Sequence, residues 1–363
     1  METKEIVVFL TGGTIAMRSS PLGAVPADDL EASLQEALHD AKAVLRFIPW
    51  ATKPSPHITP EDMYRLAQDI ATELDKTAVY GAIVLHGTDT LAETAFVLDK
   101  VLTSPKPVIC TGAMRHMEEN GYDGIRNVVQ SVLACLAMPA SSEVLIQMGD
   151  FLHTATDAVK NDSMSVVPFC SPHRGIVGRV INGRVQFLQS TVVQRPRLPF
   201  TVQGITCRVP LMACYSGMQV DDIIFPCAPL GVVAQAGSTE SIHASALCNA
   251  RLTASQEDGL LELLPQGIVL EAFGAGNIPP GIIPLVEYFL ASGVAVVIAS
   301  RCALGGVAPL YGYEGGGGQL LAKGAFSAGH LPAYKAQLLL KMALASGYPV
   351  PKLPEIFTDD RYR

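Results

Sequence analysis

The chain has little of three things: long apolar runs, basic charge and paired cysteines. Its 363 residues contain no run of about 18 uncharged apolar residues, so the sequence predicts no transmembrane helix and no membrane partner. Glu2 and Glu5 precede an apolar run that breaks at Gly12-Gly13, which does not fit a secretory signal. The formal net charge is -8, whereas phosphate binding needs a basic face, so nucleic acid is not expected as a partner.

Ligand patterns for metal or redox chemistry are also missing. None of the eight cysteines forms a C-x-x-C pair, which argues against a zinc ribbon or a thioredoxin-like site. Cys110 and Cys135 lie in apolar runs and are expected to be buried free thiols, for which the reducing cytoplasm is the simplest compartment. The eight histidines show no H-E-x-x-H spacing, so we expect no metal.

Short apolar segments alternate with helical patterns in the first half of the chain, which indicates a parallel sheet. Helices are expected to begin at Thr59, at Thr90 with a capping-box pattern, and at Gly124. The length favours about two domains: a doubly wound, mostly parallel α/β domain over residues 1–194, and a smaller α/β domain over residues 226–363. Residues 195–225 are expected to hold a linker and the start of the second domain. The expected strands of the first domain are Ile6–Leu10, Val79–Leu85, Pro107–Cys110 and Glu143–Met148.

Turn signals mark the later part of the chain. Asn182-Gly183 predicts a hairpin between two short strands. The glycine run Gly315–Gly318 is interpreted as a flexible surface loop. The second domain is expected to contain strands at Gly267–Phe273 and Val294–Ala299, and helices near Leu285–Ala291 and Ala333–Ala345.

Two hydroxyl-rich turns follow apolar runs, Thr11-Gly12-Gly13-Thr14 and His86-Gly87-Thr88-Asp89-Thr90. Because ligands of open α/β sheets bind beyond the carboxyl ends of the strands, the two turns could face one another across one pocket. Thr14 could act as a nucleophile if a base lies nearby, or it could cap a backbone amide in an ordinary turn. The turn lacks the G-x-G-x-x-G pattern of dinucleotide sites, and no cofactor is expected.

Three further polar residues, Thr88, Asp89 and Lys160, each allow two interpretations. Asp89 at a strand end could hold a substrate ammonium or orient a hydroxyl, although threonine and aspartate also favour helix caps, which is the alternative for Thr88 as well. Because Thr90 fits the capping-box pattern, capping explains Thr88 and Asp89 less well. Lys160 follows an expected strand in a polar stretch; it could serve as a base if desolvated, or be a solvated loop lysine.

These segments resemble the bacterial-type L-asparaginases and glutaminases, which are threonine amidohydrolases. Residues 11–16 and 86–90 are similar to the two signature segments of the family, and the resemblance extends over most of the chain. Thr111–Arg115 with Asp123-Gly124, and Gly267–Pro279, are similar to two further family segments in the same order.

The resemblance implies a role for each matching residue. Thr14 matches the nucleophile that forms an acyl-enzyme, and Thr88, Asp89 and Lys160 match a second catalytic group in which the lysine deprotonates a threonine. The counterpart of Asp89 also holds the α-ammonium of the substrate. The resemblance further implies a homo-oligomer, a dimer or a tetramer. The implied substrate-binding residues are Ser55 for the α-carboxylate, Ala113 for the amide through its backbone, and Asn277, which a neighbouring subunit lends.

The chain departs from the family pattern at three places. The short segment Met17–Val25 lacks the tyrosine that assists the nucleophile, and Pro56 replaces a residue able to form a hydrogen bond. Gly312 stands where secreted members use a glutamate from the partner subunit, with Glu314 nearby. Loss of polar recognition groups can redirect the choice of substrate.

The expected function is therefore an amidohydrolase that releases ammonia from a small carboxylic-acid amide, with L-asparagine as the default substrate. Glutamine, or an amide without the α-amino group, is an alternative substrate. A second alternative is a sensor that binds an amide or amino acid without turnover. The amidase subunit of a tRNA-dependent amidotransferase is disfavoured by the acidic charge.

Overall fold

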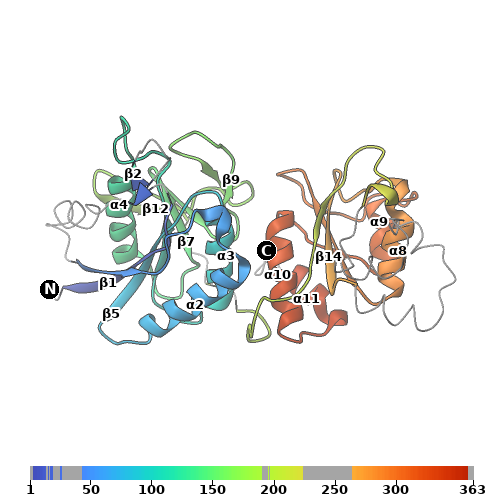
Figure 1. Cartoon of the computed structure of the whole chain (residues 1–363), viewed down its shortest axis with the longest axis horizontal. Helices are drawn as coiled ribbons and strands as arrows, with labels where there is room; N and C mark the ends of the chain where they lie inside the picture. The colour runs from blue at the N-terminus through green and yellow to red at the C-terminus, as the bar shows by residue number, and fades with distance from the viewer. Residues whose placement is uncertain are drawn as a thin grey trace, which may run out of the picture. The chain divides into compact units, whose positions relative to one another are not determined.

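The computed structural model describes residues 3–13, 15, 17–18, 25–26, 43–189, 195, 197–223 and 264–358. The chain divides into two compact units between Gly204 and Ile205. The prediction of an α/β protein with a large, mostly parallel sheet and a smaller second α/β part is confirmed (Figure 1). No helix in the described ranges is both long and apolar enough to cross a membrane.

The first unit is built on an eight-stranded sheet with the order β12-β11-β8-β7-β6-β5-β1-β4. Five strands from β7 to β4 are parallel to one another, and the remaining three complete the sheet in antiparallel pairs. The strands are β1 (Lys4–Leu10), β4 (Ala43–Pro49), β5 (Val79–Leu85), β6 (Val108–Thr111), β7 (Leu145–Met148), β8 (Phe151–Thr154), β11 (Gly178–Ile181) and β12 (Arg184–Phe187).

The parallel strands follow a doubly wound order. From β1 the chain moves outward to β4 on one side, then returns to β5 on the other side and continues to β6 and β7. The direction of winding therefore reverses between β1 and β5. In open α/β sheets this reversal opens a crevice at the carboxyl ends of the two strands, here Leu10 and Leu85.

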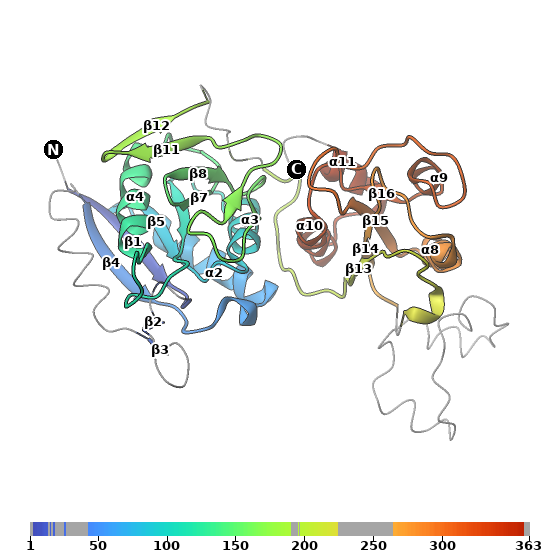
Figure 2. The same cartoon turned by 90° about the horizontal axis from the view of Figure 1, so that it is seen from above.

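Helices cover both faces of this sheet, as Figure 2 shows from above. Helices α2 (Pro60–Leu74) and α3 (Leu91–Val101) pack on one face, and α4 (Gly124–Ala137) packs on the other. Because side chains alternate along a strand, Val7 points to the face of α2 and α3, whereas Val8 points to the face of α4. The strands are buried on both sides, which explains their continuous apolar runs.

Two local predictions of the first unit are confirmed. Thr59 caps α2 in a full capping box: its side chain accepts from Asp62 N at 3.1 Å, and Asp62 Oδ2 accepts from Thr59 N at 3.1 Å. Asn182 and Gly183 join β11 to β12 with φ values of 50° and 70°. Positive φ at both central residues is what a type I′ hairpin turn requires.

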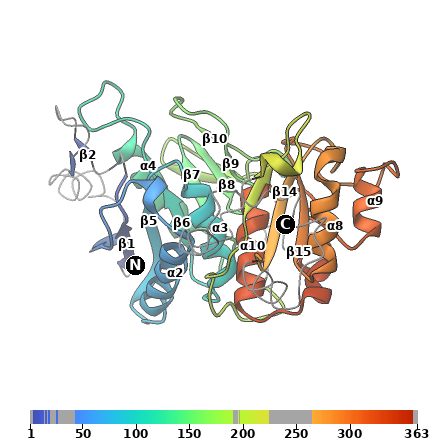
Figure 3. The ribbon, with the colours of Figure 1, turned by 45° about the vertical axis from the view of Figure 1, so that its right-hand side comes forward.

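The second unit contains a four-stranded parallel sheet with the order β13-β14-β15-β16. Helix α8 packs on one face of β14 and β15 and α10 on the other (Figure 3). The elements are β13 (Leu211–Ala213), β14 (Gly267–Ala272), β15 (Ala295–Ser300), β16 (Phe326–Ser327), α8 (Ile283–Ala291), α9 (Gly317–Ala322), α10 (Ala333–Ala345) and α11 (Leu353–Thr358). Residues 224–263 lie outside the described ranges.

The interpretation of Gly315–Gly318 as a flexible surface loop is wrong. Gly315, Gly316 and Gly317 are buried, and α9 begins at Gly317. A Cβ on Gly316 would lie 2.5 Å from the carbonyl oxygen of Tyr311, closer than real Cβ atoms approach. The run is rich in glycine because the backbone is packed closely there.

Short elements complete the described structure. The remaining strands, each of two residues, are β2 (Met17–Arg18), β3 (Val25–Pro26), β9 (Val159–Lys160) and β10 (Phe169–Cys170). The 3₁₀ helices are Ser55–His57, Val220–Asp222, Pro280–Ile282 and Val350–Lys352.

Candidate active site

The first turn begins where β1 ends. The backbone N–H and the hydroxyl of Thr11 both donate to the Leu85 carbonyl, at 3.1 and 3.0 Å, which joins the ends of β1 and β5. Gly12 and Gly13 have φ values of 107° and 88°, which other residues rarely adopt. Thr14 lies outside the described residues, and its two chain neighbours, Gly13 and Ile15, are both buried.

The two turns touch through their backbones. A Cβ placed on Gly13 would lie 2.4 Å from both the Cα and the N of Gly87. On its other side Gly87 approaches Ser55, whose Cβ and Oγ would each lie 2.7 Å from a Cβ on Gly87. The structure thus brings the chain next to Thr14, the turn at residues 86–90, and Ser55 into direct contact at the reversal point of the sheet.

Lys160 lies against the second turn. Its Nζ is 2.9 Å from Thr88 Oγ1 and 2.6 Å from Asp89 Oδ1. The lysine is placed by the pairing of β9 with β10, in which Lys160 lies opposite Phe169. Thr88 is 8% exposed and the Lys160 side chain 18%, whereas the Asp89 carboxylate is 60% exposed and open to solvent.

Ser55 is buried at the start of a 3₁₀ helix, and its carbonyl accepts a hydrogen bond from Thr90 Oγ1 at 2.8 Å. The predicted capping box at Thr90 is therefore wrong. Thr90 is the N-cap residue of α3, but its side chain makes no capping bond. The hydroxyl instead connects the second turn to Ser55, so this threonine supports the site rather than the helix.

A third loop, after β6, holds Ala113. The residue is 1% exposed, and the preceding Gly112 is so close to the second turn that a Cβ there would lie 2.4 Å from His86 O. The Asp123 carboxylate accepts from the backbone N–H of Met114 and Arg115, with Asp123 Oδ1 at 3.1 Å from each. In the sequence, Asp123 stands out only as part of a segment similar to one of the family. The structure shows that it fixes the backbone beside Ala113.

His86 fixes the peptide that begins the second turn, a function not deduced from the sequence. Its Nδ1 lies 2.7 Å from the Gly87 carbonyl, which can only accept, so Nδ1 carries the proton. Nε2 then accepts from Thr94 Oγ1 at 3.0 Å. Burial lowers the pKa of His86 to about 4, which keeps the ring neutral. Because the Gly87–Thr88 peptide is trans, its N–H points away from the imidazole.

Asn277 belongs to the second unit. It follows β14 in a tight turn, where its backbone N–H donates to Phe273 O at 2.9 Å. Its Oδ1 accepts from Gly317 N at 3.1 Å, which joins this turn to the start of α9. Two backbone bonds between Phe273 and Asn277 hold the turn in place.

The described cysteines are all free, and the predicted burial of Cys110 and Cys135 is confirmed. Burial raises the pKa of the Cys135 thiol to about 12 and that of Cys110 still further. Both thiols therefore stay protonated near neutral pH and are unsuited to nucleophilic chemistry.

A doubly wound domain in which two hydroxyl-rich turns touch, and in which a lysine contacts a carboxylate and a hydroxyl at the reversal point, is typical of an α/β enzyme. The chain belongs to the asparaginase family: residues 5–193 match the family model "Asparaginase, N-terminal", and residues 250–357 match "Glutaminase/Asparaginase C-terminal domain".

Relatives of similar length support this membership. A probable L-asparaginase of Deinococcus radiodurans is 32% identical over 97% of both chains. An L-asparaginase of Bacillus licheniformis is 28% identical, covering 94% of this chain and 96% of its own length. The structure resembles that of a probable cytoplasmic L-asparaginase from Campylobacter jejuni, with a TM-score of 0.75, 27% identity, and 98% and 99% of the two chains covered.

Proposed function

We propose that this chain hydrolyses the side-chain amide of L-asparagine to L-aspartate and ammonia. The observation that carries the proposal is the position of Lys160, within hydrogen-bond distance of both Thr88 and Asp89. The turn that bears these two residues touches Gly13, the residue before Thr14. A hydroxyl, a carboxylate and an amine are thus collected beside the segment that carries the second hydroxyl.

The proposed reaction proceeds in two steps through an ester. Thr14 Oγ attacks the amide carbon, the tetrahedral intermediate collapses, and the leaving nitrogen takes up a proton and departs as ammonia. Water then attacks the ester, releasing the carboxylic acid and regenerating the Thr14 hydroxyl. The Thr88 N–H, which points away from His86, is a suitable donor to the oxyanion of each tetrahedral intermediate.

Lys160 and Thr88 are proposed as the proton-transfer pair. At 2.9 Å a proton can pass directly between the Thr88 hydroxyl and the lysine amine. Asp89 Oδ1, at 2.6 Å from Nζ, orients the lysine and balances its charge when it is protonated. The exposed part of the Asp89 carboxylate is available to a substrate ammonium.

Recognition of the α-carboxylate is assigned to Ser55, and that of the amide to the backbone at Ala113. Ser55 is next to Gly87, and its carbonyl accepts a hydrogen bond from Thr90. These contacts fix the backbone from which the Ser55 side chain extends. Asp123 holds the chain after Ala113 in the same way. Binding groups fixed by neighbouring hydrogen bonds lose little entropy when substrate arrives.

We further propose that the active enzyme is a homo-oligomer, a dimer or a tetramer, in which Asn277 reaches the pocket of a neighbouring subunit. Four large side chains on one loop support an interface on the second unit, because exposed apolar surface of this kind is commonly covered by a partner. They are Leu304 (62% exposed), Leu310 (68%), Tyr311 (43%) and Tyr313 (56%).

The six described free cysteines are consistent with the proposed cytoplasmic location, although a relative from Haemophilus influenzae is named as periplasmic.

Glutamine is the second candidate substrate. Pro56, beside Ser55, lacks a backbone N–H, so one donor that another residue would offer to a carboxylate is missing at this place. A relative from Pseudomonas aeruginosa that is 27% identical is named a glutaminase-asparaginase. Weaker recognition of the substrate carboxylate would permit a longer or simpler amide.

The first test measures ammonia release from asparagine, glutamine and simple monoamides. We expect turnover of asparagine, its loss in Thr14→Ala, and a loss of at least about a hundredfold in Lys160→Met, because the proton-transfer partner is removed. Circular dichroism of both variants should match the unsubstituted protein, because Met is close to Lys160 in length and Ala is a small replacement for Thr14.

Two outcomes would contradict this assignment. Near-normal rates in either variant would remove the role given to that residue. Calorimetric binding of asparagine by folded protein that releases no ammonia from any of the amides would indicate a sensor instead of an enzyme.

A further inference from the structure

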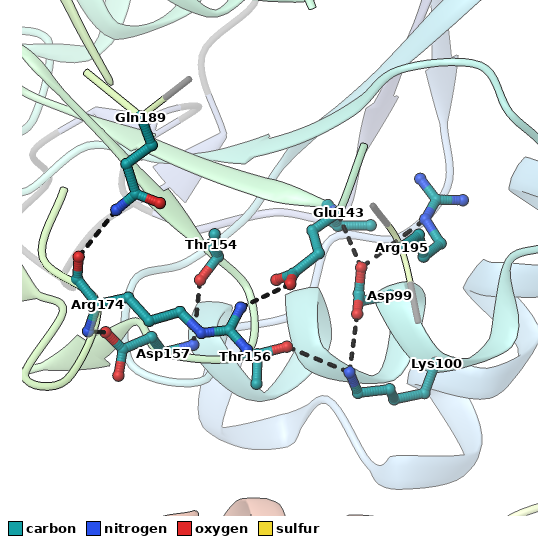
Figure 4. Close-up of polar contacts among 10 residues, drawn as sticks. Asp99, Lys100, Glu143, Thr154, Thr156, Asp157, Arg174, Gln189 and Arg195 are labelled. Atoms are coloured by element: carbon teal, nitrogen blue, oxygen red, sulfur yellow. Dashed lines mark hydrogen bonds and ion pairs between the residues drawn. The ribbon is translucent and has the colours of Figure 1, made fainter. Parts of the chain in front are cut away.

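A cluster of mostly buried charged groups lies in the first unit, at the ends of the strands that are opposite the hydroxyl turns. It gathers around the end of α3, the start of β7 and the end of β8 (Figure 4). Asp99, Lys100 and Glu143 are 1%, 6% and 0% exposed. Arg174 donates to Glu143 Oε1 at 2.8 Å, and Arg195 Nε lies 3.7 Å from Asp99 Oδ1.

Helix α3 connects this cluster to the second turn. It begins at Leu91, directly after Thr88 and Asp89, and carries Lys100 in its last turn. Lys100 Nζ bonds Thr156 Oγ1 at 3.2 Å, and four residues later Lys160 Nζ bonds Thr88 and Asp89. The segment Thr156–Lys160 therefore runs antiparallel to α3 and is attached to its two ends.

The backbone between the two attachments is at most as long as the helix beside it, and the remaining reach comes from the side chains of Lys100 and Lys160. From Leu91 to Lys100 the helix rises about 13.5 Å at 1.5 Å per residue. Four residues of extended chain span about 13 Å at most. The segment begins in a turn, closed by Ala158 N donating to Thr154 O at 2.9 Å, so it is shorter than that limit. The lower attachment at Thr156 thus limits where Lys160 can reach.

The buried partners of Lys100 hold its amine in a position from which it donates to Thr156. The Lys100 side chain is fully buried and its Nζ is paired with Asp99 Oδ2 at 3.0 Å. The Nζ also lies 5.2 Å from the centre of the Phe96 ring. A buried ion pair is a poor source of stability, because desolvation offsets the attraction between the charges. What such a pair does provide is a buried hydrogen-bond donor directed at Thr156.

A second contact fixes the segment from its other side. The Asp157 carboxylate accepts from the backbone N–H of His173 at 3.1 Å and of Arg174 at 2.7 Å. Through Arg174 this contact is linked to Glu143, at the start of β7 (Figure 4). Thr156 and Asp157 are therefore held by neighbouring parts of one buried network.

We propose that Thr156, held by Lys100, is a positioning residue for Lys160. The buried ammonium fixes the Thr156 hydroxyl at one end of α3, and this sets the register at which Lys160 meets Thr88 and Asp89 at the other end. The inference rests on the proposed function, because it gives Lys160 its catalytic task. Thr156 does not touch the reacting atoms and acts through Lys160 alone.

The test compares three substitutions of buried hydroxyl groups. Thr156→Val keeps the shape and removes the acceptor, Thr156→Ser keeps the hydroxyl, and Ser142→Ala removes a hydroxyl that bonds only Pro139 O at 2.7 Å. Thr156 and Ser142 are both 3% exposed, which makes them matched in burial. If Thr156→Val does not fold, Thr156→Ala replaces it.

We expect kcat for asparagine to fall about tenfold in Thr156→Val with KM within about twofold, because a small displacement of a proton-transfer group slows chemistry more than binding. Thr156→Ser should restore kcat, and Ser142→Ala should retain it despite a comparable loss in thermal stability. Unchanged kcat in Thr156→Val, or an equal loss in Ser142→Ala, would overturn the proposal.

A double-mutant cycle then tests whether Thr156 acts through Lys160. The residual rate of Lys160→Met, measured at high enzyme concentration, should not fall further when Thr156→Val is added. A further tenfold loss would mean that Thr156 acts by another route and would overturn the positioning role. Full activity in Lys160→Met would instead contradict the proposed function, so the two failures are distinguishable.

Discussion

At the scale of single residues, the contact between Gly13 and Gly87 determines the site more than any one hydrogen bond. Gly13 combines a positive φ of 88° with a backbone neighbour 2.4 Å from where its Cβ would stand. Gly183, in the hairpin turn, has a φ of 70° and nothing within 4 Å of its would-be Cβ. The two glycines therefore separate the cost of backbone strain from the cost of close packing.

Gly13→Ala and Gly183→Ala are expected to behave differently. Gly183→Ala should cost about 1 kcal/mol of stability through strain alone and leave kcat unchanged. Gly13→Ala should cost more, about 2–3 kcal/mol, because the two turns must move apart, and its kcat should fall at least tenfold. Thermal unfolding and ammonia release measure both effects. Equal losses in the two variants would show that the two turns do not need this contact.

At the scale of elements, α3 begins at the proposed catalytic turn and ends in the buried charged cluster. Its first residues are connected to Ser55 by Thr90, whose hydroxyl bonds Ser55 O at 2.8 Å. True helix capping occurs instead at α2, through Thr59. Two threonines with the same sequence pattern thus have different tasks, one in the stability of a helix and one in the alignment of the site.

Thr90→Val should raise KM for asparagine several-fold, because Ser55 loses the contact that fixes its backbone. Thr59→Ala should instead lower the free energy of unfolding by about 1 kcal/mol, as expected for loss of a cap, with KM near that of the unsubstituted protein. Steady-state kinetics and denaturant unfolding of both variants measure these effects. A raised KM in Thr59→Ala with none in Thr90→Val would reverse the two assignments.

How much could be read from the sequence depends on whether the deciding contacts are local. The strand Val79–Leu85 was predicted with its observed bounds because a strand buried on both faces is apolar throughout. The strand Ala43–Pro49 was missed, because it lies at the sheet edge, is only partly buried and contains Arg46. The hairpin turn at Asn182-Gly183 was predicted because its conformation depends on two adjacent residues.

Contacts between distant segments could not be read in the same way. The capping box at Thr90 failed because Ser55, 35 residues earlier, takes its hydroxyl. Lys160 was a candidate base from its polar segment and from the family resemblance, whereas its distance to Asp89 required the fold. The buried charged groups of Asp99, Lys100 and Glu143 resemble ordinary surface residues in sequence, because only folding brings them together.

At the scale of the whole molecule, two buried histidines tie stability to pH. Burial lowers the pKa of both His86 and His153 to about 4. His153 is 1% exposed and its Nδ1 lies 2.9 Å from Ser171 Oγ. In the unfolded chain each imidazole returns to its ordinary pKa near 6.5 and takes up a proton that the folded form rejects.

The sign of the pH effect follows from proton binding. Below pH 6.5 the unfolded chain binds more protons at these histidines, so their contribution to stability is complete above that pH and is lost as the pH falls toward 4. Between pH 7 and pH 5 each histidine should cost about 2 kcal/mol. Glu143 acts in the opposite direction, because burial raises its pKa and the folded form gains a proton there first.

Thermal unfolding across this pH range tests the effect. The midpoint should fall steeply from pH 7 to pH 5, and His153→Gln should reduce the slope of that fall even if it lowers the midpoint at pH 7. His57→Gln, at an exposed histidine, should keep the slope of the unsubstituted protein. Because the two buried rings contribute independently, about half of the histidine-dependent slope should survive in His153→Gln. A slope unchanged by His153→Gln would mean that His153 is already protonated in the folded protein at pH 5, or that other groups govern its acid sensitivity.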